Sequence, residues 1–133
     1  MKFQTMMIIK AVVCLCFGVL ILLSPGFVYS LFLGISLDPG GAFAARQYGI
    51  SLIGTLLITW FARNAVESDA RWAITLGLCI YDAMGFVLAL AGEITGLLSP
   101  MGWSIVVLYL LLALGFGYFL VKRPQPVTRP KAS

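Results

Sequence analysis

The chain has 133 residues, of which 61% are hydrophobic and 11% are charged, and its formal net charge is +4. An ordinary soluble domain has about 45–50% apolar and about 25% charged residues, and a domain of this size cannot bury so much apolar surface. The sparse charge and high aliphatic content also exclude an intrinsically disordered chain. The composition predicts an integral membrane protein with a single domain.

The residue types present exclude several kinds of chemistry. Histidine is absent, so the chain cannot form a Ser-His-Asp triad, a His-ligated haem site or a zinc site of the usual type. Cys14, Cys16 and Cys79 lie in apolar segments without a CxxC spacing, which favours a role as small apolar residues. We therefore predict no enzymatic activity, no cofactor, no metal and no nucleic-acid partner.

Four segments are long and apolar enough to cross a hydrocarbon core of about 30 Å, which takes about 20 helical residues. They are approximately 6–24, 39–62, 70–92 and 100–121. Asp38 and Ser99 each precede a proline, so a capping side chain stands before a proline at the first helical position. Ser68 and Asp69 can cap the third segment. We predict an all-α bundle of four transmembrane helices over residues 1–121, followed by a basic, proline-rich tail at 122–133.

The N-terminal segment has a competing interpretation as a secretory signal, with Lys10 before the apolar stretch 11–23 and a cleavage site at 28–30. Tyr29 fits poorly in a small-residue cleavage site, so we predict an uncleaved first span. The apolar run from Phe27 to Leu37 is too short to cross the membrane. We predict a short interfacial helix at 25–34; the alternative is a continuous, kinked first helix.

The basic residues predict the orientation of the bundle. Eight of the nine lie on one side of a four-span model, and the opposite loops, 25–38 and 93–99, contain none. Both termini are therefore expected in the cytoplasm of a bacterium, with the protein in its inner (plasma) membrane. Cations of the tail are expected to contact anionic lipid headgroups; they are Lys122, Arg123, Arg129 and Lys131.

Two charged residues lie deep within the predicted spans, and such residues are functional candidates. At 1.5 Å per helical residue, Arg46 and Asp82 differ in depth by only about 5 Å, so the arginine can pair with Asp82. It can instead extend outward to Glu93, and the sequence does not decide between them. The predicted polar intramembrane cluster comprises Arg46, Gln47, Ser51, Tyr81, Asp82 and Tyr109, with Glu93 at its outer edge.

This cluster has three interpretations. Its groups can satisfy one another and fix the register of the helices, they can form a cavity for a solute or lipid headgroup, or Asp82 can relay protons. Small residues at helical spacing also predict close helix packing; the pairs are Cys14/Gly18, Ala45/Gly49, Gly85/Ala89, Gly92/Gly96 and Ala113/Gly117.

Three motifs carry a resemblance to a known family. They are "LLSPGFVYSLFLGISLDPGGAFAARQYGISLIG" at 22–54, "WFAR" at 60–63 and "GWSIVVLYLLLALGFGYF" at 102–119. The chain resembles small four-helix bacterial membrane proteins of undefined function that are loosely DoxX-like. The resemblance implies a four-helix bundle with an arginine entering the second span at the position of Arg46, and it implies no activity.

Two functions from different classes follow from these observations. The first is a non-enzymatic accessory or scaffold subunit of a larger membrane complex, because the chain is small and poor in chemistry. The alternative is a small solute-binding, lipid-binding or transport protein that uses a buried Arg46–Asp82 layer and works as a homo-oligomer. The expected partners are membrane lipids together with other membrane subunits or further copies of the chain.

Overall fold

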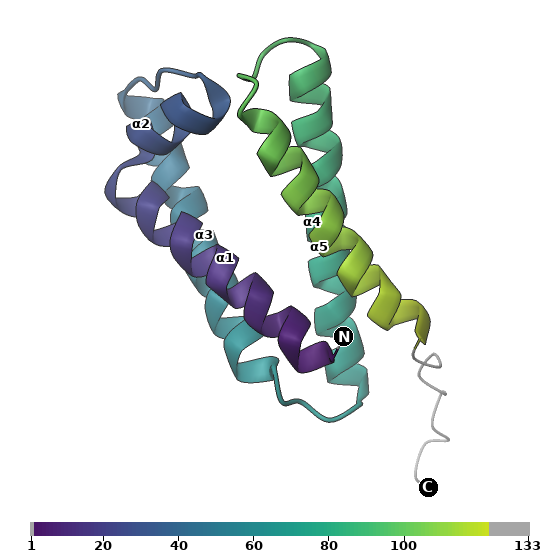
Figure 1. The fold of residues 1–133 in the computed structure, drawn as a ribbon. Coiled ribbons are helices and arrows are strands. Elements are labelled where there is room, and N and C mark those ends of the chain that lie inside the picture. The colour runs from purple at the N-terminus through teal and green to yellow at the C-terminus, as the bar shows by residue number, and fades with distance from the viewer. Residues whose placement is uncertain (1, 123–133) are drawn as a thin grey trace, which may run out of the picture.

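The computed structural model describes residues 2–122, and its only regular elements within that range are helices (Figure 1). In chain order they are α1 (Phe3–Leu23), α2 (Pro25–Val28), the π-type turn η1 (Tyr29–Leu33), α3 (Pro39–Ala62), α4 (Asp69–Ile94) and α5 (Gly102–Lys122). The predicted all-helical class is confirmed. The tail beyond Lys122, including Arg129 and Lys131, lies outside the described residues.

Side-chain caps begin two of the long helices where the sequence predicts them. The Asp38 carboxylate accepts a hydrogen bond from the Gly41 amide at 2.6 Å, and the Ser68 hydroxyl accepts one from the Arg71 amide at 3.2 Å. Ser99 does not cap α5. Its hydroxyl instead donates to the Phe32 carbonyl at 2.9 Å, and its own carbonyl accepts from Gly102, where α5 begins.

The first helix is not continuous with the segment that follows it. Ser24 has φ −145° and ψ 71°, which lies outside the helical region, and the chain then forms the short helical segment α2–η1. Gly34 ends this segment at φ 67°, a left-handed conformation that glycine adopts without steric cost. Residues 25–33 therefore form a helical segment that is not continuous with α1, and its interfacial position stays a prediction.

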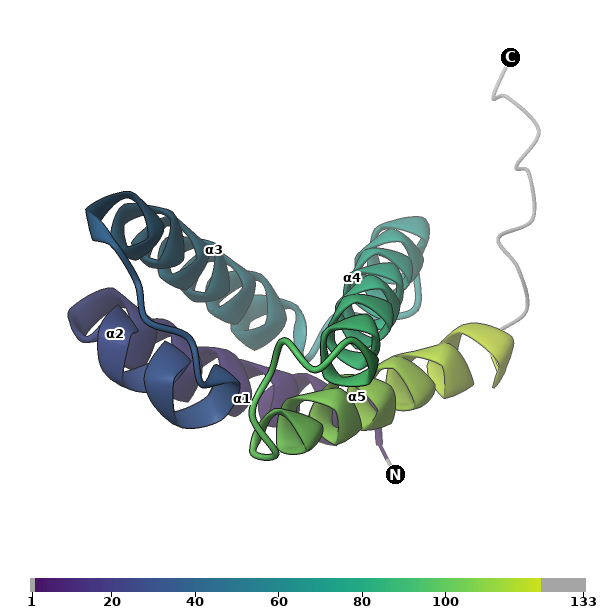
Figure 2. The ribbon, with the colours of Figure 1, turned by 90° about the horizontal axis from the view of Figure 1, so that it is seen from above.

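The long helices form two antiparallel pairs (Figure 1). Helix α1 packs along α3, and α4 packs along α5. The two pairs meet where the start of α1 lies against α5, and α3 and α4 diverge from the loop that joins them (Figure 2). The contact between the two pairs is therefore made mainly by residues of α1 and α5, and much of the surface of α3 has no helix against it.

Glycines allow close contact within each pair. A Cβ atom on Gly49 of α3 would lie 3.1 Å from the Gly18 carbonyl oxygen of α1, and a Cβ on Gly85 of α4 would lie 2.6 Å from the Tyr109 ring of α5. Three of the small-residue pairs predicted from the sequence therefore contain a glycine at a close helix–helix contact; they are Cys14/Gly18, Ala45/Gly49 and Gly85/Ala89.

An apolar cluster joins the two helix pairs at the end of the bundle where the N-terminus lies. Its members come from α1, α4 and α5 and are buried; they are Phe3, Met6, Met7, Leu78, Leu112 and Phe116. At the opposite end, the Ser99 amide donates to the Leu33 carbonyl at 3.0 Å. The two pairs are thus connected at both ends, and the candidate site lies between these connections.

Within residues 2–122, three helices are long and apolar enough to cross a membrane: α1, α4 and α5. Large apolar side chains on these helices are exposed, among them Val12, Val87 and Leu114. A surface of this kind is typical of a membrane protein. Helix α3, the remaining predicted span, has 24 residues and includes the exposed polar residues Arg46, Gln47 and Ser51.

Candidate functional site

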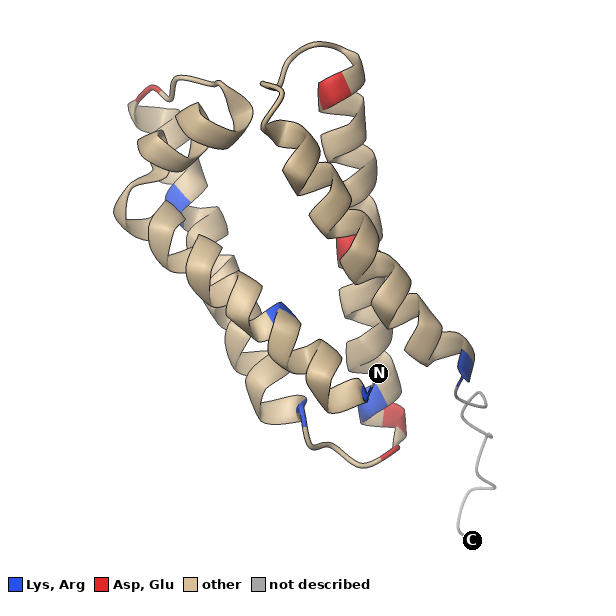
Figure 3. Cartoon of the chain, viewed as in Figure 1, with Lys and Arg blue, Asp and Glu red and all other residues tan. Residues whose placement is uncertain are grey.

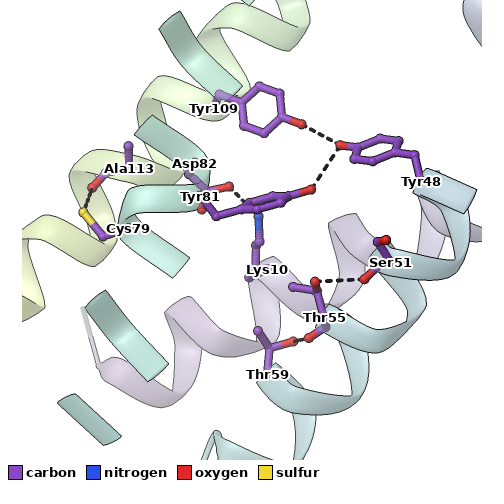
Figure 4. A network of polar contacts seen from close by, with 10 residues as sticks. All are labelled: Lys10, Tyr48, Ser51, Thr55, Thr59, Cys79, Tyr81, Asp82, Tyr109 and Ala113. Atoms are coloured by element: carbon purple, nitrogen blue, oxygen red, sulfur yellow. Dashed lines mark hydrogen bonds and ion pairs between the residues drawn. The ribbon is translucent and has the colours of Figure 1, made fainter. Parts of the chain in front are cut away.

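A buried ion pair connects the two helix pairs. The Lys10 Nζ atom of α1 lies 2.5 Å from the Asp82 Oδ1 atom of α4, and the two side chains are 2% and 0% exposed (Figure 4). Lys10 is in the second turn of α1, between the buried residues Met7 and Ala11. Taking two charges out of water is expensive, and their mutual attraction must offset that cost.

The ion pair leaves one acceptor atom unused. Asp82 Oδ2 is buried and has no hydrogen-bond partner among the described residues. The Lys10 ammonium also lies 4.9 Å from the centre of the Tyr81 ring, a distance at which the face of the ring attracts a cation. Lys10 therefore has two favourable contacts on α4, while Asp82 depends on Lys10 for its one contact.

Three tyrosine hydroxyls meet beside the ion pair (Figure 4). The hydroxyl oxygens of Tyr48 on α3 and Tyr109 on α5 lie 2.6 Å apart, and the Tyr81 hydroxyl of α4 donates to Tyr48 at 3.4 Å. This cluster links helices α3, α4 and α5, whereas the ion pair links α1 and α4. Together they place polar contacts from all four long helices at one level of the bundle.

The structure does not pair Arg46 with Asp82, one of the two partners that the sequence left open. The carboxylate of Asp82 is taken by Lys10, while Arg46 is exposed and has no hydrogen bond or ion pair with any residue of 2–122. The physical reason is the side of α3 on which Arg46 lies. Tyr48, two residues further on, reaches Tyr81 of α4, so Arg46 is on the opposite side of the helix and points away from Asp82. Lys10 is one of the eight cations that the four-span model counts on the cytoplasmic side, and the structure buries its side chain within the bundle.

The alternative partner of Arg46, Glu93, is elsewhere as well. Its carboxylate lies against Gly102 at the start of α5, and Glu93 Oε1 is buried without a partner among residues 2–122.

The remaining members of the predicted polar cluster divide into two groups. Tyr81, Asp82 and Tyr109 come together at the site, whereas Gln47 and Ser51 are exposed on α3. The Ser51 hydroxyl donates to the backbone carbonyl of Gln47 at 3.1 Å.

Sequence reasoning missed two residues of the site, Lys10 and Tyr48. The signal for Lys10 was its spacing from small and apolar residues on α1. Lys10 follows Met7 by three residues and precedes Cys14 by four, and Gly18 comes four residues later, so all four lie on the same side of the helix. Tyr48 precedes Gly49, which lies at the contact with α1. Its position beside that contact turns its hydroxyl toward α4 and α5 (Figure 4).

The arrangement is suited to holding helices together. Its donors and acceptors are one ammonium group, one carboxylate and three phenolic hydroxyls, and no group of three or more His, Cys, Asp or Glu residues in the described part of the chain is placed to bind a metal ion. Cys79 donates to the Ala113 carbonyl at 3.5 Å, within the α4–α5 pair.

No family model matches this chain, and neither a curated protein nor a solved structure matches it. The resemblance to DoxX-like proteins stays a prediction.

Proposed function

We propose that the chain is a four-span protein of the bacterial inner membrane and acts as a non-enzymatic accessory or scaffold subunit of a larger membrane complex. The observation that carries this proposal is Arg46, an exposed and unpaired cation about 10 Å from the start of a helix of membrane-spanning length. A partner subunit that covers α3 would neutralise it.

Chain geometry supports α3 as the fourth span. Helix α3 packs antiparallel along α1, and its 24 residues extend about 36 Å at 1.5 Å per residue, enough to cross a core of about 30 Å. The loop from α3 to α4 lies at the end of the bundle where α1 begins (Figure 1). If α1 and α4 both cross the membrane, α3 is the segment that returns the chain between them.

The exposed half of α3 is too polar for lipid alone. Ala45, Gly49 and Leu52 are buried in the contact with α1, so side chains on the opposite half point away from it. That half contains Arg46, Gln47 and Ser51, which we call the α3 polar surface. A charged side chain costs about 3 kcal/mol at the centre of a bilayer on insertion scales, and an acid on a partner would remove most of the penalty for Arg46.

A second copy of the chain is a poor source of that acid. A two-fold axis along the membrane normal would set Arg46 of one copy against Arg46 of the other, since both copies present the same surface at the same depth in the membrane. The chain has five acidic residues, and none of them is an exposed residue near this depth. Asp82 is paired with Lys10 and Glu93 lies against Gly102. The others lie in loops or at helix starts; they are Asp38, Glu67 and Asp69. A different subunit with an intramembrane acid fits better.

The test is co-purification from the native membrane in mild detergent, with the mass of the intact complex measured. Arg46→Gln is expected to reduce the amount of bound partner at least tenfold, because the acid of the partner loses its cation. Arg63→Gln is the matched control, since Arg63 ends the same helix and its guanidinium group lies over the Trp60 ring. An acid-to-arginine change in the partner, combined with Arg46→Glu, should restore binding. A chain that purifies only as a monomer or homo-oligomer would contradict the proposal.

One observation favours the alternative of transport. The unpartnered Asp82 Oδ2 atom is a site where a proton or solute could exchange, and it now belongs to a Lys10–Asp82 pair rather than to an Arg46–Asp82 layer. The charge-free double variant described in the Discussion separates the two functions. Normal assembly with a retained cellular phenotype supports a subunit, whereas normal assembly with complete loss of the cellular phenotype supports transport.

The orientation of the proposed four-span topology is also testable. The cations Lys2, Arg63, Arg71 and Lys122 gather at the end of the bundle where α1 begins, and the opposite end has Asp38 and Glu93 without a loop cation in 25–38 or 93–101 (Figure 3). We expect a cytoplasm-active reporter to work after residue 133 and between 64 and 68, and to fail between 95 and 99. Periplasmic activity of a reporter after residue 133 would refute this orientation.

A further inference from the structure

A cavity of about 380 Å³ lies at the end of the bundle where α1 begins, between three helices. Its volume is within the range of about 300–1,000 Å³ that is typical of small-molecule sites. Six of the lining residues carry the argument: Lys2 and Phe3 at the start of α1, Arg71 and Trp72 in the first turn of α4, and Phe119 and Lys122 at the end of α5.

The charged part of this cavity is basic. Lys2, Arg71 and Lys122 line it together with a single acid, Glu67. Arg71 is held in place, because one guanidinium nitrogen donates to the Ala65 carbonyl at 3.0 Å and the group lies 3.8 Å from the centre of the Phe3 ring. A guanidinium group has five N–H donors, so Arg71 keeps donors for the paired oxygens of a phosphate, a geometry that arginine recognises well.

The other part of the cavity is apolar and aromatic. Phe3, Trp72, Phe119 and Leu120 line it, and tryptophan is enriched where one side of a residue meets lipid and the other meets water. The cavity also lies at the ends of α1, α4 and α5, the three helices long and apolar enough to cross a membrane. A ligand with an anionic group joined to an apolar chain fits both the lining and the location.

We propose that this cavity binds the phosphate headgroup of an anionic glycerophospholipid, with its acyl chain against the apolar part. The proposal is independent of the α3 polar surface, because the two sites share no residue. It extends the predicted headgroup contact of Lys122 from a surface attraction to a defined site that includes Lys2 and Arg71.

Trp72 provides a direct signal for binding. In the full chain carrying Trp60→Phe and Trp103→Phe, Trp72 is the single tryptophan, and its fluorescence is measured in detergent during titration with short-chain phosphatidylglycerol. We expect a saturable change at least tenfold tighter than with phosphatidylcholine of the same chain length, because the zwitterionic headgroup has no net charge. Glycerol phosphate, which has the anionic group without acyl chains, should bind more weakly than phosphatidylglycerol because it leaves the apolar part of the cavity empty.

Single substitutions in that background test the residues. Arg71→Gln and Lys122→Gln should each weaken phosphatidylglycerol binding about fivefold, the factor that corresponds to about 1 kcal/mol per cation near an anionic surface. Arg63→Gln lies at the same end of the bundle outside the cavity and should leave binding unchanged. Lys122 forms no hydrogen bond in the described part of the chain, so its substitution reports on binding even if Arg71→Gln disturbs folding.

Two results would overturn the proposal. Equal affinities for phosphatidylglycerol and phosphatidylcholine, or an equal loss with Arg63→Gln, would mean that the cavity does not select the anionic headgroup. Glycerol phosphate that binds as tightly as the anionic lipid would identify a soluble phosphate ester as the ligand instead of a lipid.

Discussion

Replacing Asp82 with alanine is expected to destabilise the helix bundle by about 3–5 kcal/mol, because it leaves the Lys10 ammonium buried without a counter-charge. Both side chains are almost completely buried, and the carboxylate supplies the one hydrogen bond of Lys10 within the described residues. The measurement is the free energy of unfolding in mixed detergent micelles. Lys10→Met should have a comparable effect, since it leaves the carboxylate of Asp82 buried without its cation.

The double variant Lys10→Met, Asp82→Leu distinguishes a charge effect from a packing effect. Replacing a buried ion pair by apolar residues of similar volume is often neutral or stabilising, so this variant should recover most of the stability lost in either single variant. Arg46→Gln is the control for removing a charge, and it should change the stability of the isolated chain little because Arg46 is exposed. Strict additivity of the two single changes would mean that Lys10 and Asp82 do not interact.

The starts of the helices show which part of the fold follows from local sequence. The helix starts at Pro39 and Asp69 depend on neighbouring residues, and the predicted caps Asp38 and Ser68 are confirmed. The start of α5 was displaced because Ser99 bonds to Phe32, far away in the sequence. A capping rule based on neighbouring residues does not include the Phe32 carbonyl, an acceptor that only folding brings close to Ser99.

The candidate site was predicted in part for a related reason. Asp82, Tyr81 and Tyr109 were identified from their depth along the helices, and they do lie together. Depth alone does not say which helices are neighbours. Depth also does not say which side of a helix a residue occupies. Lys10 lies on the side of α1 that meets α4 and pairs with Asp82, whereas Arg46, at a similar depth, lies on the exposed side of α3.

The contact between α1 and α3 predicts the second large effect. Gly49→Leu is expected to destabilise the bundle by about 3 kcal/mol, the upper end of the usual range for overpacking. Even the first added carbon would lie 3.1 Å from two backbone atoms, the Gly18 carbonyl oxygen and the Leu22 amide nitrogen. Backbone atoms of a helix cannot move aside as a side chain can, so α1 and α3 must separate along their contact.

Gly54→Leu is the matched control for this change, because Gly54 is on the same helix and a Cβ there meets no atom within 4 Å. It should leave the stability unchanged or raise it by up to about 1 kcal/mol, since leucine favours a helix more than glycine does.

Separation of α1 and α3 should also move Tyr48 away from Tyr109, because their 2.6 Å contact depends on where the first pair holds Tyr48. Spin labels on cysteines introduced at positions 48 and 109, in a chain whose native cysteines are replaced by serine, report the distance between α3 and α5 by pulsed electron paramagnetic resonance. That distance should be the same in the Gly54→Leu background as in the unsubstituted chain and longer in the Gly49→Leu background. Equal stability and equal label distances in the two backgrounds would mean that the glycine contact does not set the spacing of α1 and α3.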